Sequence, residues 1–178
     1  MYEAYDRYVK NTIYDAMIGY ATSLTGQFKK TGSLTADNLN ALCDLVSTAT
    51  GYPVMIMGTR TALSKVTALQ NASYISDTMK DEHMRTGLLG MFEGKQLIEI
   101  PQVFEKNKIG SYKIDNTLLW IMPMTDVKWI KLVNEGDVQL SQIMDKDINV
   151  DMTYSAEMQV KLGCAVMLNS AFGVYDVE

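Results

Sequence analysis

The stretch GLLGMFEGKQLIEIPQ, residues 87–102, decides the fold because it joins two kinds of secondary structure. Three glycines within eight residues precede a segment of alternating apolar residues that closes at Pro101. A glycine-rich loop that binds phosphate follows a strand and opens a helix. Here the order is reversed, since residues 76–87 predict a helix before the glycines and residues 94–101 a strand after them. The glycines are therefore expected to turn the backbone out of a helix and into a sheet.

Upstream of this stretch the pattern is mainly helical. In the first helix, apolar residues recur every three or four positions, so one face is expected to pack and the other to be solvated. The second helix is expected to be capped by Thr35 or Ser33 and to end at Gly51. The basic, glycine-bounded segment 25–33 is predicted to be a hinge, and residues 53–58 a short buried strand. The predicted helices cover residues 1–24, 35–51, 59–69 and 76–87.

Downstream of residue 94 the chain is predicted to be mainly β. The clearest pattern is in residues 152–168, where every even position is apolar, while the odd positions up to Lys161 are polar. Because this strand is unusually long, it is expected to run through two lobes with a bend at Gly163. The other predicted strands cover residues 94–101, 116–123, 126–133, 135–143 and 171–178. Helices followed by strands predict an α+β fold.

Composition limits the function of the chain. Of its 178 residues, 47% are hydrophobic and 21% charged, which is typical of a globular protein. The net charge of -5 leaves no basic excess for general binding to a nucleic-acid backbone. No apolar run reaches the length of a membrane span. Cys43 and Cys164 lie in apolar surroundings and are expected to be buried free thiols in a reducing compartment.

The residues that could carry chemistry form no catalytic or metal-binding pattern. The single histidine, His83, has no partner for a zinc site and is expected to be exposed on a helix. The pair Asp145 and Asp147 lacks the spacing of a calcium loop and is expected to be solvated. Trp120 and Trp129 lie in adjacent predicted strands and are expected to pack in a hairpin. We therefore predict no enzyme activity, no cofactor and no metal.

Five segments carry a family resemblance through their order along the chain. They are LTADNLNAL (34–42), PVMIMGTRTALSKV (53–66), GLLGMFEGKQLIEIPQVF (87–104), LLWIMPMTDVKWIKLVNEG (118–136) and DMTYSAEMQVKLGCAVMLNSAFGV (151–174). Together they resemble the C-terminal half of tailed-phage major capsid proteins of the Hong Kong 97-type fold, over essentially the whole chain. Members of that family are structural proteins that assemble into hexamers and pentamers and close an icosahedral shell around DNA.

The resemblance implies a division into two domains. A central sheet flanked by helices forms an axial domain, expected over residues 31–135 and about 166–178. A long spine helix and a long strand belong to a peripheral domain, expected over residues 1–30 and about 136–165. Family members also have an N-terminal arm and an extended loop before the spine helix. This sequence has neither and starts within a helix, so it is expected to be a truncated form.

The resemblance also implies the partners and the location. The partners are copies of the same chain and, for a full-length form, a scaffold, a portal and a prohead protease. No membrane and no specific nucleic-acid sequence is expected to be bound, and the location is the virion, after synthesis in the bacterial host cytoplasm. Two alternatives stay open: an encapsulin-like compartment shell, and a nucleotide- or phosphate-binding module that uses residues 58–60 or 87–94.

The candidate subunit contact is the segment QVFEKNKIGSY, residues 102–112. It is lysine-rich, is broken by a glycine and interrupts a β-rich region, as a contact loop would. The resemblance places it near the rotation axis of the capsomer; the alternative is an ordinary solvent-exposed loop. The residues expected to form the contact are Phe104, Lys106, Lys108 and Tyr112.

Overall fold

The computed structural model describes residues 2–70, 75–105, 108–126, 128, 130–137, 139–144, 154–166 and 172–177. The helices are α1 (Tyr2–Ser23), α2 (Ala36–Thr50), α3 (Arg60–Leu69) and α4 (Asp77–Thr86), with a short 3₁₀ helix η1 (Gly26–Phe28). The strands are β1 (Lys29–Gly32), β2 (Val54–Gly58), β3 (Met91–Phe92), β4 (Lys95–Glu99), β5 (Leu118–Pro123), β6 (Ile130–Asn134), β7 (Gln139–Met144), β8 (Tyr154–Gln159), β9 (Leu162–Val166) and β10 (Gly173–Val177).

Local sequence signals fix the ends of the helices. The Thr35 hydroxyl accepts a hydrogen bond from the backbone N–H of Asn38 at 3.3 Å, and so caps α2. Gly51 ends the same helix with a φ of 74°, a left-handed conformation that glycine adopts without strain. Thr59 and Ser76 cap α3 and α4 in the same way as Thr35 caps α2. The predicted cap Thr35 and the predicted end at Gly51 are confirmed.

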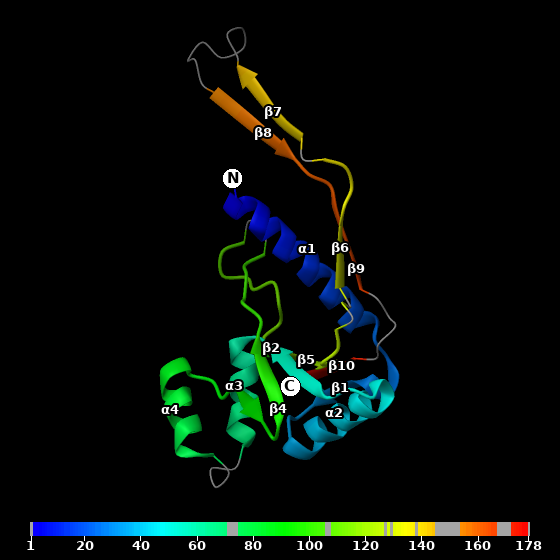
Figure 1. Cartoon of the computed structure of the whole chain (residues 1–178), viewed down its shortest axis with the longest axis vertical. Coiled ribbons are helices and arrows are strands. Elements are labelled where there is room, and N and C mark those ends of the chain that lie inside the picture. The colour runs from blue at the N-terminus through cyan, green and yellow to red at the C-terminus, as the bar shows by residue number, and fades with distance from the viewer. Residues whose placement is uncertain are drawn as a thin grey trace.

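Six strands form a mixed sheet in the order β1-β10-β5-β2-β4-β3. The central strand β5 is antiparallel to both β10 and β2. Two pairs are parallel, β1 with β10 and β2 with β4. We call this sheet, together with α2, α3 and α4, the sheet lobe; it forms the lower part of Figure 1. The predicted α+β class is confirmed at this level.

Both faces of the sheet are covered. On one face α2 and α3 pack on β2, β5 and β10. The buried side chains of this face are Leu39, Leu42, Cys43, Val46, Val54, Ile56, Ala62, Leu63, Val66, Phe92, Leu119, Ile121, Tyr175 and Val177. On the other face α1 packs together with residues of the 100–114 segment. Its buried side chains are Tyr14, Met17, Ala21, Ile100, Ile114, Trp120, Met122, Phe172 and Val174.

The remaining strands form a long two-stranded ribbon, which we call the arm. Its first part pairs β6 with β9, and its second part pairs β7 with β8, both antiparallel. The Glu135 backbone N–H donates to the carbonyl of Lys161 at 3.0 Å between the two parts. Figure 1 shows β9 running beside α1, and the β7–β8 hairpin reaching beyond α1 at the end of the molecule farthest from the sheet.

Three predictions about the strands were wrong. The predicted hinge 25–33 contains β1, which pairs with β10 at the edge of the sheet. The long alternating strand breaks at 160–161 rather than at Gly163, which lies inside β9 opposite Val133. The break lies opposite the connection between β6 and β7. In that connection Gly136 has a φ of 83°, a conformation outside the range of a β-strand. Finally, Trp120 does not lie in a hairpin of β5 and β6, because β5 pairs with β2 and β10.

Candidate functional site

The candidate contact loop is a hairpin-like excursion between β4 and β5. Phe104 and Tyr112 form an isolated antiparallel bridge across it. The Glu105 N–H donates to the Ser111 carbonyl at 2.9 Å, and the Lys113 N–H donates to the Val103 carbonyl at 2.8 Å. Backbone pairing therefore joins the two sides of this loop at residues 103–105 and 111–113, and we call residues 102–113 the contact hairpin.

Side chains hold the base of the contact hairpin. The Gln102 amide nitrogen donates to the Ile114 carbonyl at 2.7 Å, and its oxygen accepts from the Ile114 N–H at 3.1 Å. The Tyr14 hydroxyl of α1 donates to the Pro101 carbonyl at 2.8 Å. An ion pair of Lys113 with Asp15 adds a second tie to α1. The hairpin is thus fixed both to itself and to α1 at its base.

The tip of the contact hairpin presents apolar side chains to solvent. The rings of Phe104 and Tyr112 stack with centroids 5.5 Å apart, and each ring is about half exposed. Ile109 is 97% exposed, the largest value among the large hydrophobic side chains that the structure describes. Burial of such side chains against another surface would be favourable by roughly 1.5–3 kcal/mol for each fully covered residue. A tip of this kind suits a protein contact.

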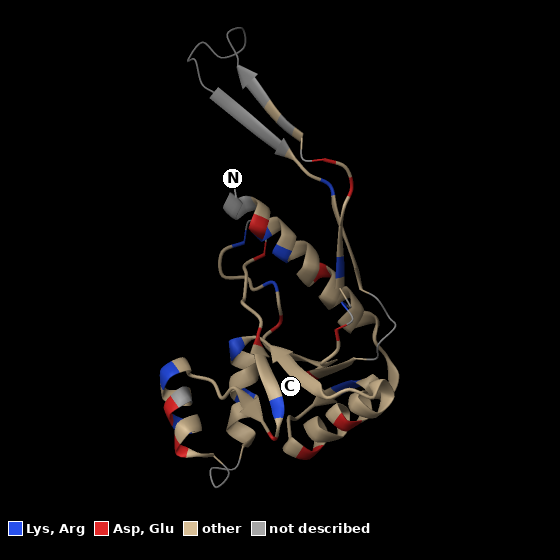
Figure 2. Ribbon diagram, viewed as in Figure 1, with Lys and Arg blue, Asp and Glu red and all other residues tan. Residues whose placement is uncertain are grey.

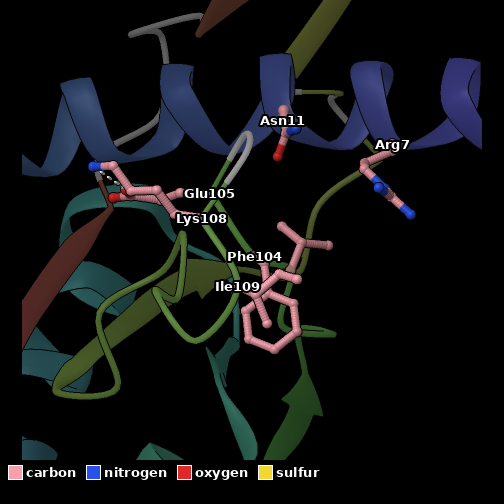
Figure 3. Close-up of a pocket in the computed structure, with 7 residues that line it drawn as sticks. Arg7, Asn11, Phe104, Glu105, Lys108 and Ile109 are labelled. Atoms are coloured by element: carbon pink, nitrogen blue, oxygen red, sulfur yellow. Dashed lines mark hydrogen bonds and ion pairs between the residues drawn. The ribbon is translucent and has the colours of Figure 1, made fainter.

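A hollow of about 660 Å³ separates the contact hairpin from the N-terminal half of α1. Arg7 and Asn11 of α1 line one side of it, and Phe104 and Ile109 line the other (Figure 3). The Asn11 side-chain oxygen is buried and has no hydrogen-bond partner among the residues that the structure describes. The hollow combines apolar surface, one guanidinium and an unsatisfied acceptor, all of which a bound polypeptide could contact.

One ion pair forms between described side chains near the tip. Lys108 donates to a Glu105 carboxylate oxygen at 2.9 Å (Figure 3). The hydrogen bond and the charge of Lys108 lower the pKa of Glu105, and Glu105 in turn raises the pKa of Lys108. Both groups are solvent-exposed, so the pair contributes little to stability. The ion pair orients the side chains of Glu105 and Lys108 and does not create a reactive group.

The structure brings together three of the four residues that the sequence singled out. Phe104, Lys108 and Tyr112 all lie on the contact hairpin, and Lys106 lies outside the described residues. Sequence reasoning missed Ile109, although an isoleucine next to the glycine of a lysine-rich loop was a usable signal. It also missed Arg7 and Asn11, for which no local signal exists, since they join the hollow only through the packing of α1.

The two glycine segments considered for nucleotide binding form helix ends and turns of the backbone. At 58–60, the Thr59 side chain accepts from the Ala62 N–H at 3.4 Å and Arg60 donates to the Thr86 carbonyl at 2.7 Å. At 87–94, Gly87 ends α4 with a φ of 78°, and Gly94 turns β3 into β4 with a φ of 79°. The expectation that the glycines of residues 87–94 turn the chain from helix into sheet is confirmed for Gly87, which ends α4, whereas Gly94 turns one strand of the sheet into the next.

Other groups considered for chemistry lie apart from each other. His83 is exposed on α4, as expected, and Cys43 and Cys164 are free thiols. Burial raises the pKa of Cys43 to about 12, whereas Cys164 is only half-buried. Asp145, Asp147 and Trp129 lie outside the described residues. Among the described residues no cluster of histidine, cysteine or acidic side chains could hold a metal, and none of the helices is long and apolar enough to span a membrane.

A comparison of the sequence with models of known protein families finds a match to nearly the whole chain. The matching family model is described as SPbeta prophage-derived putative capsid protein YonB, and it covers residues 1–176. A search of curated proteins finds no match.

Proposed function

The chain belongs to the family described as SPbeta prophage-derived putative capsid protein YonB, and we propose on this basis that it is a shell subunit that assembles with copies of itself. The observation that carries the proposal is the family match over residues 1–176. Because the family is described as a capsid protein, a structural role in the virion is proposed for this chain rather than catalysis. Assembly would proceed through many modest contacts between subunits that together give a stable shell.

The finer proposal is that the subunit has the Hong Kong 97-type capsid fold. The sheet lobe would be the axial domain, expected over residues 31–135 and about 166–178 but without β6, which belongs to the arm, and α1 with the arm would be the peripheral domain. This is supported by a mixed sheet with helices on both faces, by a 22-residue helix α1, and by a ribbon that leaves the sheet beside that helix (Figure 1). In such a shell the subunits would form hexamers and pentamers around DNA, with a scaffold, portal and prohead protease as further partners.

The contact hairpin is proposed to meet a neighbouring subunit. Phe104, Lys108 and Tyr112, with Lys106 of the same segment, are the residues assigned to the contact. In support, the stacked rings are half exposed and the neighbouring Ile109 is almost fully exposed, although the base of the hairpin is firmly held. A loop whose base is held in place loses less conformational entropy on binding than an untethered loop.

Particle formation tests the proposal. The purified chain is examined by analytical ultracentrifugation and negative-stain electron microscopy over a range of concentrations. The same measurements are repeated after co-expression with the proteins that the neighbouring genes encode. We expect rings or closed shells, and nuclease-protected DNA in shells assembled in the host. A chain that stays monomeric under all these conditions would contradict a role as shell subunit.

Variants of the contact hairpin test the assigned residues. Ile109→Asp and Phe104→Asp place a charge where an apolar contact is proposed, and we expect each to reduce particle yield about tenfold or more. Met124→Asp is the matched control, since Met124 is also an exposed apolar residue but lies at the end of β5. Equal loss of particles in all three variants would remove the support for a specific contact at the hairpin.

A further inference from the structure

The contact hairpin and the base of the arm meet at one buried cluster, on the face of the sheet that α1 covers. Tyr14 of α1 lies in this cluster and is 6% exposed. Ile100 and Ile114, which lie on either side of the contact hairpin in the sequence, are buried in the same cluster. Ile130 of β6 and Val166 of β9 pack against it from the base of the arm. Because protein interiors are close-packed and transmit strain, the position of α1 affects both elements.

Two directed interactions add to this packing and tie the contact hairpin to α1. The Tyr14 hydroxyl donates to the Pro101 carbonyl at 2.8 Å. Burial raises the pKa of Tyr14, so the hydroxyl keeps its proton and stays a donor at neutral pH. The next residue of the helix, Asp15, forms an ion pair with Lys113. Pro101 leads into the contact hairpin and Lys113 ends it, so α1 is tied to both of its sides.

The same helix also contacts the arm, since β9 runs beside α1 (Figure 1). Figure 2 shows charged residues of both signs along α1. Among the ion pairs of the described residues, only that of Asp15 with Lys113 joins α1 to another element of the chain. The helix therefore contacts both elements that are proposed to meet neighbouring subunits, and its polar ties are to the contact hairpin.

We propose that Tyr14 and Asp15 are positioning residues for the subunit contact. They hold the base of the contact hairpin against α1, and thereby fix its orientation relative to the arm. Phe104 and Ile109 then reach a neighbouring subunit from a base that is already in place, which reduces the conformational entropy lost on binding. This inference rests on the proposed function and adds two residues, both outside the contact hairpin, on which its contact depends.

A pair of hydroxyl deletions tests the role of Tyr14. Tyr14→Phe removes the hydrogen bond to Pro101 and keeps the ring in the buried cluster. Tyr175→Phe is the matched control, since Tyr175 is 1% exposed and its hydroxyl donates to the Ser33 carbonyl at 2.7 Å, within the sheet lobe. Each variant loses one hydrogen bond from a buried tyrosine to a backbone carbonyl, so the melting temperatures of the two should fall by similar amounts.

Hydrogen exchange on the free chain reads the anchoring of the contact hairpin without any need for assembly. The reporters are the amides of Glu105, Lys113 and Ile114, which donate to acceptors within the hairpin. In Tyr14→Phe we expect them to exchange about fivefold faster or more, relative to the amides of β2. In Tyr175→Phe this ratio should stay as in the unaltered chain. The same ratio in both variants would contradict a positioning role for Tyr14.

A charge exchange tests the ion pair in the same way. Asp15→Lys places a lysine beside Lys113, and we expect the same amides to exchange faster than in the unaltered chain. Adding Lys113→Asp to this variant restores opposite charges, so the exchange rates should return toward those of the unaltered chain. A double variant that exchanges as fast as Asp15→Lys alone would contradict a positioning role for Asp15.

Assembly connects this anchoring with the proposed function. Tyr14→Phe is expected to need about fivefold more protein or more than Tyr175→Phe to form particles, although the two variants are similarly stable. If the unaltered chain forms no particle, the proposed function falls and the inference with it. If it forms particles and the two tyrosine variants assemble at the same concentration, only the inference falls.

Discussion

The sheet lobe and the arm differ in what covers their strands. In the sheet lobe β5 is flanked by β2 and β10 and packed on both faces, so Leu119, Trp120, Ile121 and Met122 are all buried. In the arm each strand has one partner in the described residues, and β6 exposes Leu132 and Val133. An isolated two-stranded ribbon is at best marginally stable in water. The lobe therefore has its own core, whereas the arm depends on α1 and, we propose, on neighbouring subunits.

The largest expected effect comes from the centre of the lobe. Trp120→Ala removes an almost fully buried ring from β5, and we expect a loss of about 3–5 kcal/mol in the free energy of unfolding. The indole N–H of Trp120 is buried and finds no hydrogen-bond acceptor in the described part of the chain. Trp120→Phe should therefore cost less than about 1.5 kcal/mol, since it keeps an aromatic ring and removes that donor. Urea denaturation checks both values, and a loss for Trp120→Ala no larger than that for Trp120→Phe and below about 1.5 kcal/mol would argue against tight packing here.

A close approach within the lobe gives the next largest effect. A Cβ at Gly58 would lie 2.9 Å from Leu119 Cδ2, a side chain that is itself fully buried. Gly58→Ala is expected to destabilise the fold by about 1–3 kcal/mol through overpacking. Gly163→Ala in the arm is the contrasting control, since nothing lies within 4 Å of a Cβ there. If Gly163→Ala proved the more damaging in thermal unfolding, the contrast between lobe and arm would fail.

Capping of α3 is expected to contribute an intermediate amount. Thr59 is buried, and its hydroxyl accepts the Ala62 N–H at the start of the helix. Thr59→Ala should cost about 1 kcal/mol, and Thr59→Ser should retain most of the capping. The measurement is chemical denaturation of both variants. A serine variant as unstable as the alanine variant would show that the methyl group, rather than the hydroxyl, matters.

A substitution on the exposed surface of the arm is expected to have little effect on the stability of the unassembled protein. Val133 is 58% exposed on β6, so Val133→Asp is expected to change the stability of the unassembled protein by less than about 0.5 kcal/mol. If the arm contacts neighbours, the same change should clearly reduce particle yield. Comparing the melting temperature with the yield of particles measures the two effects, and a large destabilisation of the free chain would contradict the description of the arm as uncovered.

The smallest effect concerns the contact hairpin. Because Lys108 lowers the pKa of Glu105, the ion pair stabilises the hairpin above the ordinary pKa of 4.5 and is lost as the pH falls through the lowered value. Nuclear magnetic resonance shifts of the hairpin should therefore titrate below pH 4.5, without unfolding of the lobe. In Lys108→Met the midpoint should rise, and an unchanged midpoint would mean that the pair does not form in solution.

The sequence predicted the features that depend on nearby residues but not those that depend on contacts between distant segments. The end of α2 at Gly51, the buried strand β2 and the turn at Gly87 depend on nearby residues, and all were predictable. Strand pairing was not, since β5 and β10 lie far apart along the chain and nothing in the KKTG of β1 marks it as a strand. At the candidate site the hairpin residues stood out by composition, but Arg7 and Asn11 reach the hollow only because α1 folds back over the sheet.

Hydrogen exchange on free and assembled protein tests most directly the claim that the lobe is self-sufficient and the arm relies on neighbours. In the free chain, amides of β2, β5 and β10 should exchange slowly and only through global unfolding, whereas those of β7 and β8 should exchange rapidly. In assembled particles the arm should become protected, with little change in the lobe. An arm as protected as the lobe in the free chain, or one that gains no protection on assembly, would contradict the account.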